Sequence, residues 1–258
     1  ASVHGPSIPS MGWLFEDAAR AYREAIRRGA RPYEHDTPLA APAIYGIGDS
    51  LIHFIEKSAW EDNFVALPQP ELVPAKGFLS IDHLTNNVMR GTMNTWVDFY
   101  TKIFGFTEVR SFHIRGNTTG LQSYALRSPD GSFCIPINEG SEEKSQIEEY
   151  LRDYKGAGVQ HLAFLTDDLL DSLDHLTGTS ITTLDIDDSY YNEAFQRVPT
   201  LREDKARIRA HRVLVDGDEQ GYLLQIFTPP IIGPIFIELI QRQNHLSFGE
   251  GNFGALFR

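Results

Sequence analysis

Phe78-Leu79-Ser80-Ile81-Asp82-His83-Leu84-Thr85 decides the fold, because it is typical of a strand and is followed by a helix, and because this order recurs. The helix is predicted from about Asn94 to Gly105, where bulky apolar residues recur at the spacing of one helix face. Val159-Gln160-His161-Leu162-Ala163-Phe164-Leu165 repeats the strand, and Asp168 is a suitable N-cap for the helix that follows. Residues 11–29 show the same order a third time.

Short β-rich runs bounded by turn residues follow each predicted helix. They are residues 42–47 and 51–56, then 109–114, 121–126 and 133–138, then 212–215, 222–227 and 235–240. Hairpin turns are predicted at Pro129-Asp130-Gly131 and Asp216-Gly217-Asp218. The predicted fold class is therefore α+β, built from repeated βαβββ modules.

The proline-rich stretch 68–74 indicates an extended linker. We therefore expect a single module over residues 1–67 and a two-module domain over residues 75–258. Residues 185–205 are polar, which favours a loop with a surface helix, and an active-site lid is the alternative.

Charge and cysteine content narrow the classes of function. The 258 residues carry 23 Lys and Arg against 35 Asp and Glu, a net charge of −12, which disfavours nucleic acid and anionic membrane surfaces as partners. The apolar stretch 229–240 is interrupted and too short to span a bilayer, and the first residues do not resemble a signal peptide. Cys134 is the single cysteine, so we expect no internal disulfide and a cytoplasmic location.

Three side chains suggest a metal site. His83 and His161 occupy equivalent strand positions of consecutive modules, so the repeat predicts that they face each other. Glu238 lies in the last predicted strand, where burial of its carboxylate demands a cation. The alternative to a metal is Arg242, which lies on the same strand face and would neutralise the Glu238 carboxylate. Two imidazoles and one carboxylate suit iron, manganese, nickel or zinc, and the pattern does not choose among them.

Seven ordered blocks, which together cover nearly the whole chain, resemble the 4-hydroxyphenylpyruvate dioxygenases of the vicinal-oxygen-chelate superfamily. The blocks are Ile81-Asp82-His83-Leu84-Thr85-Asn86-Asn87-Val88, Pro136-Ile137-Asn138-Glu139, Lys144-Ser145-Gln146-Ile147, Gly156-Ala157-Gly158-Val159-Gln160-His161-Leu162-Ala163, Leu223-Leu224-Gln225-Ile226-Phe227-Thr228, Ile235-Phe236-Ile237-Glu238-Leu239-Ile240-Gln241-Arg242 and Phe248-Gly249-Glu250-Gly251-Asn252-Phe253.

The resemblance implies Fe(II) held by His83, His161 and Glu238. It also implies catalytic roles for Gln225, Gln241 and Phe253, and a substrate site formed by Ser123, Asn138, Gln146, Gln160, Gln225, Phe236, Phe248, Asn252 and Phe253. Without the resemblance, Phe236 and Phe253 are equally well core residues, and Ser123 and Asn138 are more typical of a strand face or a turn.

The implied reaction is the conversion of 4-hydroxyphenylpyruvate and O2 to homogentisate and CO2, a step of tyrosine and phenylalanine catabolism. The alternatives are 4-hydroxymandelate synthase, which uses the same substrate and iron, and a catalytically silent member of the superfamily that binds an aromatic ligand. The resemblance further implies a homo-oligomer, either a dimer or a tetramer. Relatives resemble four modules where this chain supplies three, so we expect a first module and most of a C-terminal gating helix to be missing.

Overall fold

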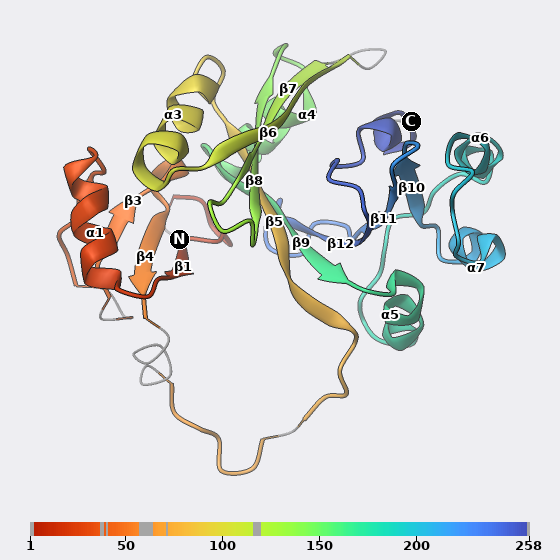
Figure 1. Ribbon diagram of the computed structural model, residues 1–258, viewed down its shortest axis with the longest axis horizontal. Coiled ribbons are helices and arrows are strands. Elements are labelled where there is room, and N and C mark those ends of the chain that lie inside the picture. The colour runs from red at the N-terminus through yellow and green to blue at the C-terminus, as the bar shows by residue number, and fades with distance from the viewer. Residues whose placement is uncertain are drawn as a thin grey trace.

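The computed structural model describes residues 3–36, 39, 41–56, 64–70, 72–115 and 120–256. One order of elements occurs three times along them (Figure 1). The first module comprises β1 (Ser10–Leu14), α1 (Ala18–Arg27), β2 (Pro32–Tyr33), β3 (Ala43–Tyr45) and β4 (Leu51–Ile55). The second comprises β5 (Phe78–Val88), α3 (Met93–Phe104), β6 (Thr107–Arg115), β7 (Gly120–Arg127) and β8 (Cys134–Gly140). The third comprises β9 (Gly158–Thr166), α5 (Leu169–Leu176), α6 (Tyr190–Arg197), α7 (Lys205–Ala210), β10 (Leu214–Gly217), β11 (Tyr222–Phe227) and β12 (Phe236–Gln243).

Two sheets result from the three modules. The first module forms a four-stranded sheet in the order β1-β4-β3-β2, and the other two share an eight-stranded sheet in the order β10-β11-β12-β9-β5-β8-β7-β6. Within each module the first and last strands pair in parallel, as β1 with β4, β5 with β8 and β9 with β12. Antiparallel pairing of β5 with β9 joins the second and third modules. The predicted α+β fold of repeated βαβββ modules is thus confirmed.

Local signals in the sequence account for the helix ends. Asp17 caps α1 by accepting the Arg20 backbone N–H at 2.7 Å, and Asp168 caps α5 through the Asp171 N–H at 2.9 Å. Gly105 ends α3 with a φ of 76°, a conformation in which a side chain would be strained. The predicted hairpin at Pro129-Asp130-Gly131 is present between β7 and β8.

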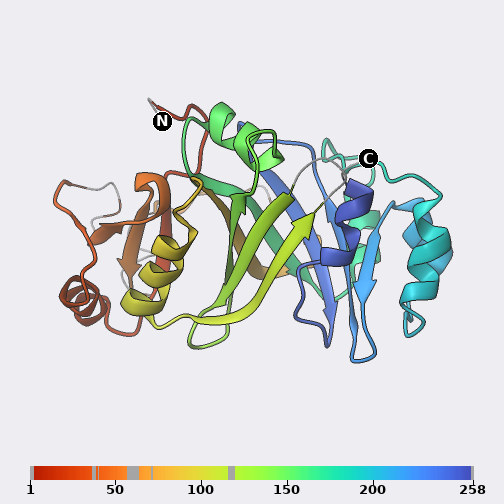
Figure 2. The ribbon, with the colours of Figure 1, turned by 90° about the horizontal axis from the view of Figure 1, so that it is seen from above.

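Helices cover one face of each sheet. A continuous apolar core joins the first module to α3, β8 and α4 (Gln146–Tyr154), so the single module is packed against the larger sheet. A second core lies between α5, α6, α7 and strands β10, β11 and β12. Figure 2 shows the eight-stranded sheet as a curved half barrel, with α8 (Phe253–Leu256) lying between its two ends.

Residues 185–205 form a loop with one helix, α6, as expected, and Ile186, Tyr191 and Val198 of this stretch are buried in the second core. Two other details differ from the prediction. The turn expected at Asp216-Gly217-Asp218 closes slightly later, where the Asp218 N–H donates to the Gly221 carbonyl at 2.9 Å. Helix α4, which follows the second module, was not anticipated.

Across the described residues, none of the helices is both long enough and apolar enough to cross a bilayer.

Candidate metal centre

His83, His161 and Glu238 converge on one face of the eight-stranded sheet. His83 Nε2 lies 3.1 Å from Glu238 Oε2, His161 Nε2 lies 3.2 Å from the same oxygen, and the two nitrogens are 3.3 Å apart. The three residues are 1%, 8% and 2% exposed, respectively. The predicted meeting of these side chains is therefore what the structure shows.

Strand register explains the convergence. Ala163 of β9 is in register with His83 of β5 on one side and with Glu238 of β12 on the other. His161 precedes Ala163 by two residues, so the pleat turns its side chain to the same face. The Ala163 side chain is a single methyl group, which leaves room for three longer side chains to meet above it.

The hydrogen-bond partners of the outer ring nitrogens are compatible with a metal at the cluster. His83 Nδ1 is 2.7 Å from Asp82 Oδ2, and His161 Nδ1 is 3.0 Å from Gln160 Oε1. Because both oxygens only accept hydrogen bonds, each neutral ring carries its proton on Nδ1 and directs an Nε2 lone pair toward Glu238. Among the described residues Glu238 Oε1 has no hydrogen-bond partner. Two imidazole lone pairs and a carboxylate with one oxygen free of hydrogen bonds suit a divalent metal.

Burial and mutual charge shift the pKa values of the three groups. Burial raises the pKa of Glu238, but the two histidines outweigh it and lower the value to about 2. Burial lowers the pKa of His83, yet the charges of Glu238 and Asp82 outweigh it, so the net shift is upward. For His161 burial dominates and lowers the pKa. Glu238 is therefore a carboxylate at neutral pH, as a metal ligand must be.

Arg242 is bound to Asp82, which corrects the alternative that it neutralises Glu238. Its Nε and Nη2 donate to the two carboxylate oxygens of Asp82 at 2.7 and 2.8 Å. This two-bond geometry is the strongest arrangement available to an arginine and a carboxylate. Glu238 accepts contacts only from the two histidines among the described side chains, which removes the main argument against a metal.

Phenylalanines surround the histidine rings. Phe236 stacks on His161 with ring centres 4.8 Å apart, and Phe227 approaches the same ring edge-on at 6.3 Å. Phe248 approaches His83 edge-on at 5.1 Å. Phe253 lies farther out, 6.5 Å from Phe112 of β6. The first three rings provide an apolar wall around the cluster.

A polar row crosses the same face. Ser123 of β7 is in register with Asn138 of β8, which is in register with Asn87 of β5. Asn138 Nδ2 donates to Asn87 Oδ1 at 3.4 Å, while Asn87 Nδ2 is buried and has no partner among the described residues. Register from His83 onward places Asn87 on the His83 face. These amides are available to a ligand.

Gln225 lies on the Glu238 face of the sheet, because Gln225 of β11 is in register with Ile240 of β12. It is buried, and its Oε1 has no partner among the described residues. Gly249 makes this position accessible to the C-terminal segment, since a Cβ there would lie 2.1 Å from Gln225 Nε2. A close backbone approach of this kind requires glycine.

Gln241 must be corrected as a catalytic candidate. It lies on the opposite face of β12 from Glu238, because side chains alternate along a strand. Its Oε1 accepts the Leu169 N–H at 2.8 Å, and its Nε2 donates to Glu203 at 2.6 Å. These bonds tie β12 to the start of α5 and give Gln241 a structural role.

Gln146 and Asn252 are the remaining candidates. Gln146 is exposed at the first turn of α4, and none of its contacts among the described residues links it to the metal cluster. Asn252 is buried, and its Oδ1 accepts from the Tyr190 hydroxyl at 2.7 Å and from Arg197 at 3.1 Å. Its Nδ2 has no partner within the described part of the chain. Asn252 is thus held by α6 with one polar group still available.

Asp82, Phe227 and Asn87 were not singled out by sequence reasoning, although all three contact the ligands or extend the polar row. Each lies in one of the seven blocks, so the blocks contained the signal. What was lacking was the geometry: a side-chain hydrogen bond joins Asp82 to the outer nitrogen of His83, and the register places Asn87 on the His83 face.

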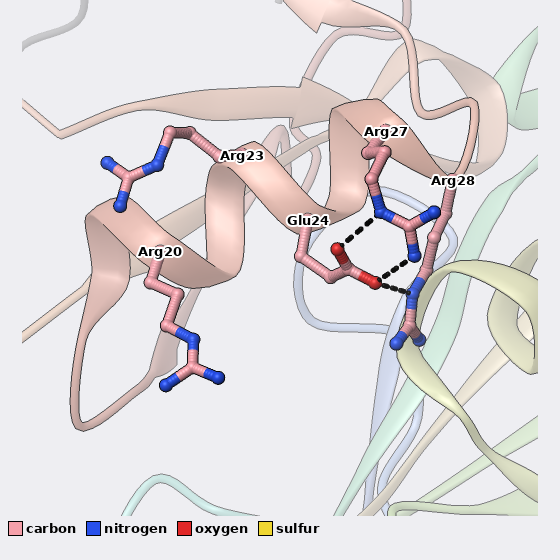
Figure 3. A pocket seen from close by; sticks show the side chains of 5 residues that line it. All are labelled: Arg20, Arg23, Glu24, Arg27 and Arg28. Carbon is pink, nitrogen blue, oxygen red and sulfur yellow. Dashed lines mark hydrogen bonds and ion pairs between the residues drawn. The ribbon is translucent and has the colours of Figure 1, made fainter.

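A separate hollow of 440 Å³ lies on α1, in the first module (Figure 3). Four arginines and one glutamate line it: Arg20, Arg23, Glu24, Arg27 and Arg28. Glu24 pairs with Arg27 and Arg28, each at 2.6 Å. The hollow contains none of the residues of the metal cluster, which lie on β5, β9 and β12.

Comparisons with known proteins agree with this geometry. Residues 1–67 match the profile of the N-terminal part of hydroxyphenylpyruvate dioxygenase, and residues 80–226 match that of the glyoxalase/bleomycin resistance protein/dioxygenase superfamily. The whole chain is 58% identical to protein MelA of Shewanella colwelliana, of which it covers 76%. It is 43% identical to a 4-hydroxyphenylpyruvate dioxygenase of Legionella pneumophila, also with 100% of the chain and 76% of the relative covered.

Among solved structures, a mutant 4-hydroxymandelate synthase from Streptomyces coelicolor superimposes with a TM-score of 0.81 at 27% identity. The match covers 99% of this chain and 76% of that one. The sequence relatives and the shared fold lead to one conclusion: the chain belongs to the 4-hydroxyphenylpyruvate dioxygenase family of the glyoxalase/dioxygenase superfamily.

Proposed function

We propose that the protein is an Fe(II)-dependent 4-hydroxyphenylpyruvate dioxygenase that forms homogentisate and CO2 in tyrosine and phenylalanine catabolism. The observation that carries the proposal is the buried His83, His161 and Glu238 cluster, whose nitrogen and carboxylate donors suit Fe(II). Membership of the dioxygenase family supports the assignment of the reaction. Each turnover consumes one O2 and releases one CO2, and both oxygen atoms of O2 enter the product.

When bound, the ferrous iron supplies positions at which the α-keto acid and O2 meet and react. The protein prepares this site through its own residues. Asp82 and Gln160 hold the ring protons on Nδ1, so that both Nε2 atoms remain available as ligands. Phe227, Phe236 and Phe248 exclude water from the reacting centre.

The polar groups that lack partners are the proposed substrate contacts. Gln225 Oε1 and Asn252 Nδ2 are buried and unpaired among the described residues, and so is Nδ2 of Asn87 beside Asn138. Buried polar groups cost free energy when unpaired, so a ligand with a phenol and a carboxylate would stabilise them. We extend this substrate role to Ser123, which lies in the polar row, and to Gln146 and Phe253 on the strength of the family resemblance.

4-Hydroxymandelate synthase is the second candidate, because a mutant of this enzyme shares the fold over nearly the whole chain. Both reactions begin with the same substrate, so the position of the ring relative to the metal must determine the product. Phe236, which stacks on His161, and Phe248, which contacts His83 edge-on, are the residues that we expect to hold that ring.

The product separates the candidates. Protein loaded anaerobically with Fe(II) is mixed with 4-hydroxyphenylpyruvate, and O2 uptake, CO2 release and the aromatic product are measured. Homogentisate with equal amounts of O2 and CO2 supports the proposal, whereas hydroxymandelate supports the synthase. Binding of the substrate without O2 uptake by the iron-loaded chain would contradict both, and Glu238→Gln is the inactive control.

A further inference from the structure

We propose that Arg242 is a positioning residue that couples metal binding at His83 to closure of the 245–252 segment over the site. The inference rests on the proposed metal site. Arg242 acts through Asp82, through the Phe248 ring and through the backbone of this segment. One side chain thereby connects two regions that are separate in sequence.

The guanidinium uses all three of its nitrogens. Nε and Nη2 hold both oxygens of Asp82, as described above, and Asp82 Oδ2 in turn accepts the Nδ1 proton of His83. Nη1 donates to the backbone carbonyls of His245 at 3.0 Å and Ser247 at 2.5 Å. The side chain is 14% exposed, so solvent screens these contacts only weakly.

The same side chain also orients an aromatic ring of the site. The guanidinium carbon lies 5.3 Å from the centre of the Phe248 ring, and Phe248 contacts His83 edge-on. His83 is therefore held by Asp82 at Nδ1 and by Phe248 at its ring, and both partners depend on Arg242. Loss of Arg242 should release both supports together.

A second set of bonds anchors the far end of the segment without touching His83. Arg197 Nη2 donates to Asn252 Oδ1 at 3.1 Å and to the Val215 carbonyl at 2.7 Å. Arg110 pairs with Glu250 at 2.7 Å, and the Gly251 N–H donates to Asp216 at 3.0 Å. Arg197 therefore provides a matched control, because it is an arginine that holds the same segment through a separate network.

Coupling between two sites is reciprocal, so it can be measured from either end. Isothermal titration calorimetry of the 258-residue wild-type chain with Co(II) gives the metal affinity. The rate of backbone hydrogen exchange in residues 245–252, measured with and without Co(II), reports how firmly the segment is held closed. We expect Co(II) to slow exchange in the wild type. Arg242→Met should weaken Co(II) binding about 10- to 100-fold, as loss of outer-shell support does elsewhere, and should abolish the metal-dependent slowing.

Arg197→Met should speed exchange near Asn252 while leaving Co(II) affinity unchanged. Arg242→Lys keeps the charge opposite Asp82 but cannot reach all four acceptors, so an intermediate affinity is expected, and this variant serves if Arg242→Met does not fold. The inference would be overturned if the Arg242 variants bound Co(II) as tightly as the wild type and still showed metal-dependent slowing of exchange. It would also be overturned if Arg197→Met weakened Co(II) binding as much as Arg242→Met does. A wild-type chain that binds no Co(II) would overturn the proposed metal site itself.

Discussion

His83 and His161 are equivalent by the repeat, yet their surroundings differ. The outer nitrogen of His83 faces a carboxylate, Asp82, which is fixed by Arg242, whereas that of His161 faces the amide of Gln160. Burial lowers the pKa of both rings, but the charges of Glu238 and Asp82 outweigh it at His83, so the pKa of His83 is raised and that of His161 is lowered. Module repetition thus brings two histidines together, and the residues around them place a carboxylate behind one ring and an amide behind the other.

The difference assigns separate tasks to the two sides of the cluster. A carboxylate behind a histidine increases its basicity as a ligand and fixes its orientation. An amide fixes orientation without adding charge. We infer that the His83 side contributes more to metal affinity, and that the His161 side, lined by Gln160 and Phe236, is left to interact with substrate.

Glu238→Gln is expected to have the largest effect, because it removes the one charge shared by both sides. Metal affinity should fall by at least about 100-fold, the upper end of the loss caused by removing outer-shell partners. Turnover should be lost. Titration with Co(II) and assays with Fe(II) measure both. Retention of wild-type affinity would show that Glu238 is not a ligand.

Asp82→Asn compared with Gln160→Met tests the asymmetry directly. Asp82→Asn should weaken Co(II) binding by about 10-fold or more, because the carboxylate behind the ring is lost. Gln160→Met should have the smaller effect on affinity, since it removes a neutral partner. Thermal unfolding of both variants controls for general damage. A larger loss of affinity with Gln160→Met would reverse the comparison.

Gln241→Met separates the two faces of β12. The substitution removes the partner of the Leu169 N–H and of Glu203 Oε1, while the Tyr222 hydroxyl still donates to Glu203 Oε2, so the free energy of unfolding should fall by about 1–3 kcal/mol. Metal affinity should not change. Chemical denaturation measures the first effect. The control is Gln225→Met on the Glu238 face, where substrate binding rather than stability should decrease. Loss of metal from Gln241→Met would contradict this assignment.

Phe236→Leu should have the smallest effect on stability. It removes the stack on His161, a contact worth about 0.5–1.5 kcal/mol beyond area burial, but keeps an apolar side chain at the site. Phe248→Leu is the matched change beside His83. We expect the Phe236 variant to lose more substrate affinity, and equal losses would remove the distinction between the two sides.

Much of this architecture could be predicted from the sequence. The strand and helix patterns around His83 and His161 revealed the repeat, and the repeat predicted that the two histidines meet. Gln241 was misassigned because a motif gives residue order but not strand face, and the alternation from Glu238 to Gln241 places the amide on the far side. The partner of Arg242 could not be predicted, because Asp82 and Arg242 are distant in sequence and meet only when β5 and β12 fold onto opposite sides of β9.

Anomalous diffraction at the iron edge, from anaerobic crystals of the Fe(II)-loaded protein, tests the central claim most directly. The account predicts one strong peak bonded to Nε2 of His83, Nε2 of His161 and the carboxylate of Glu238, with Asp82 still paired to Arg242. A peak at another position, or no peak between these three residues in iron-loaded crystals, would contradict it.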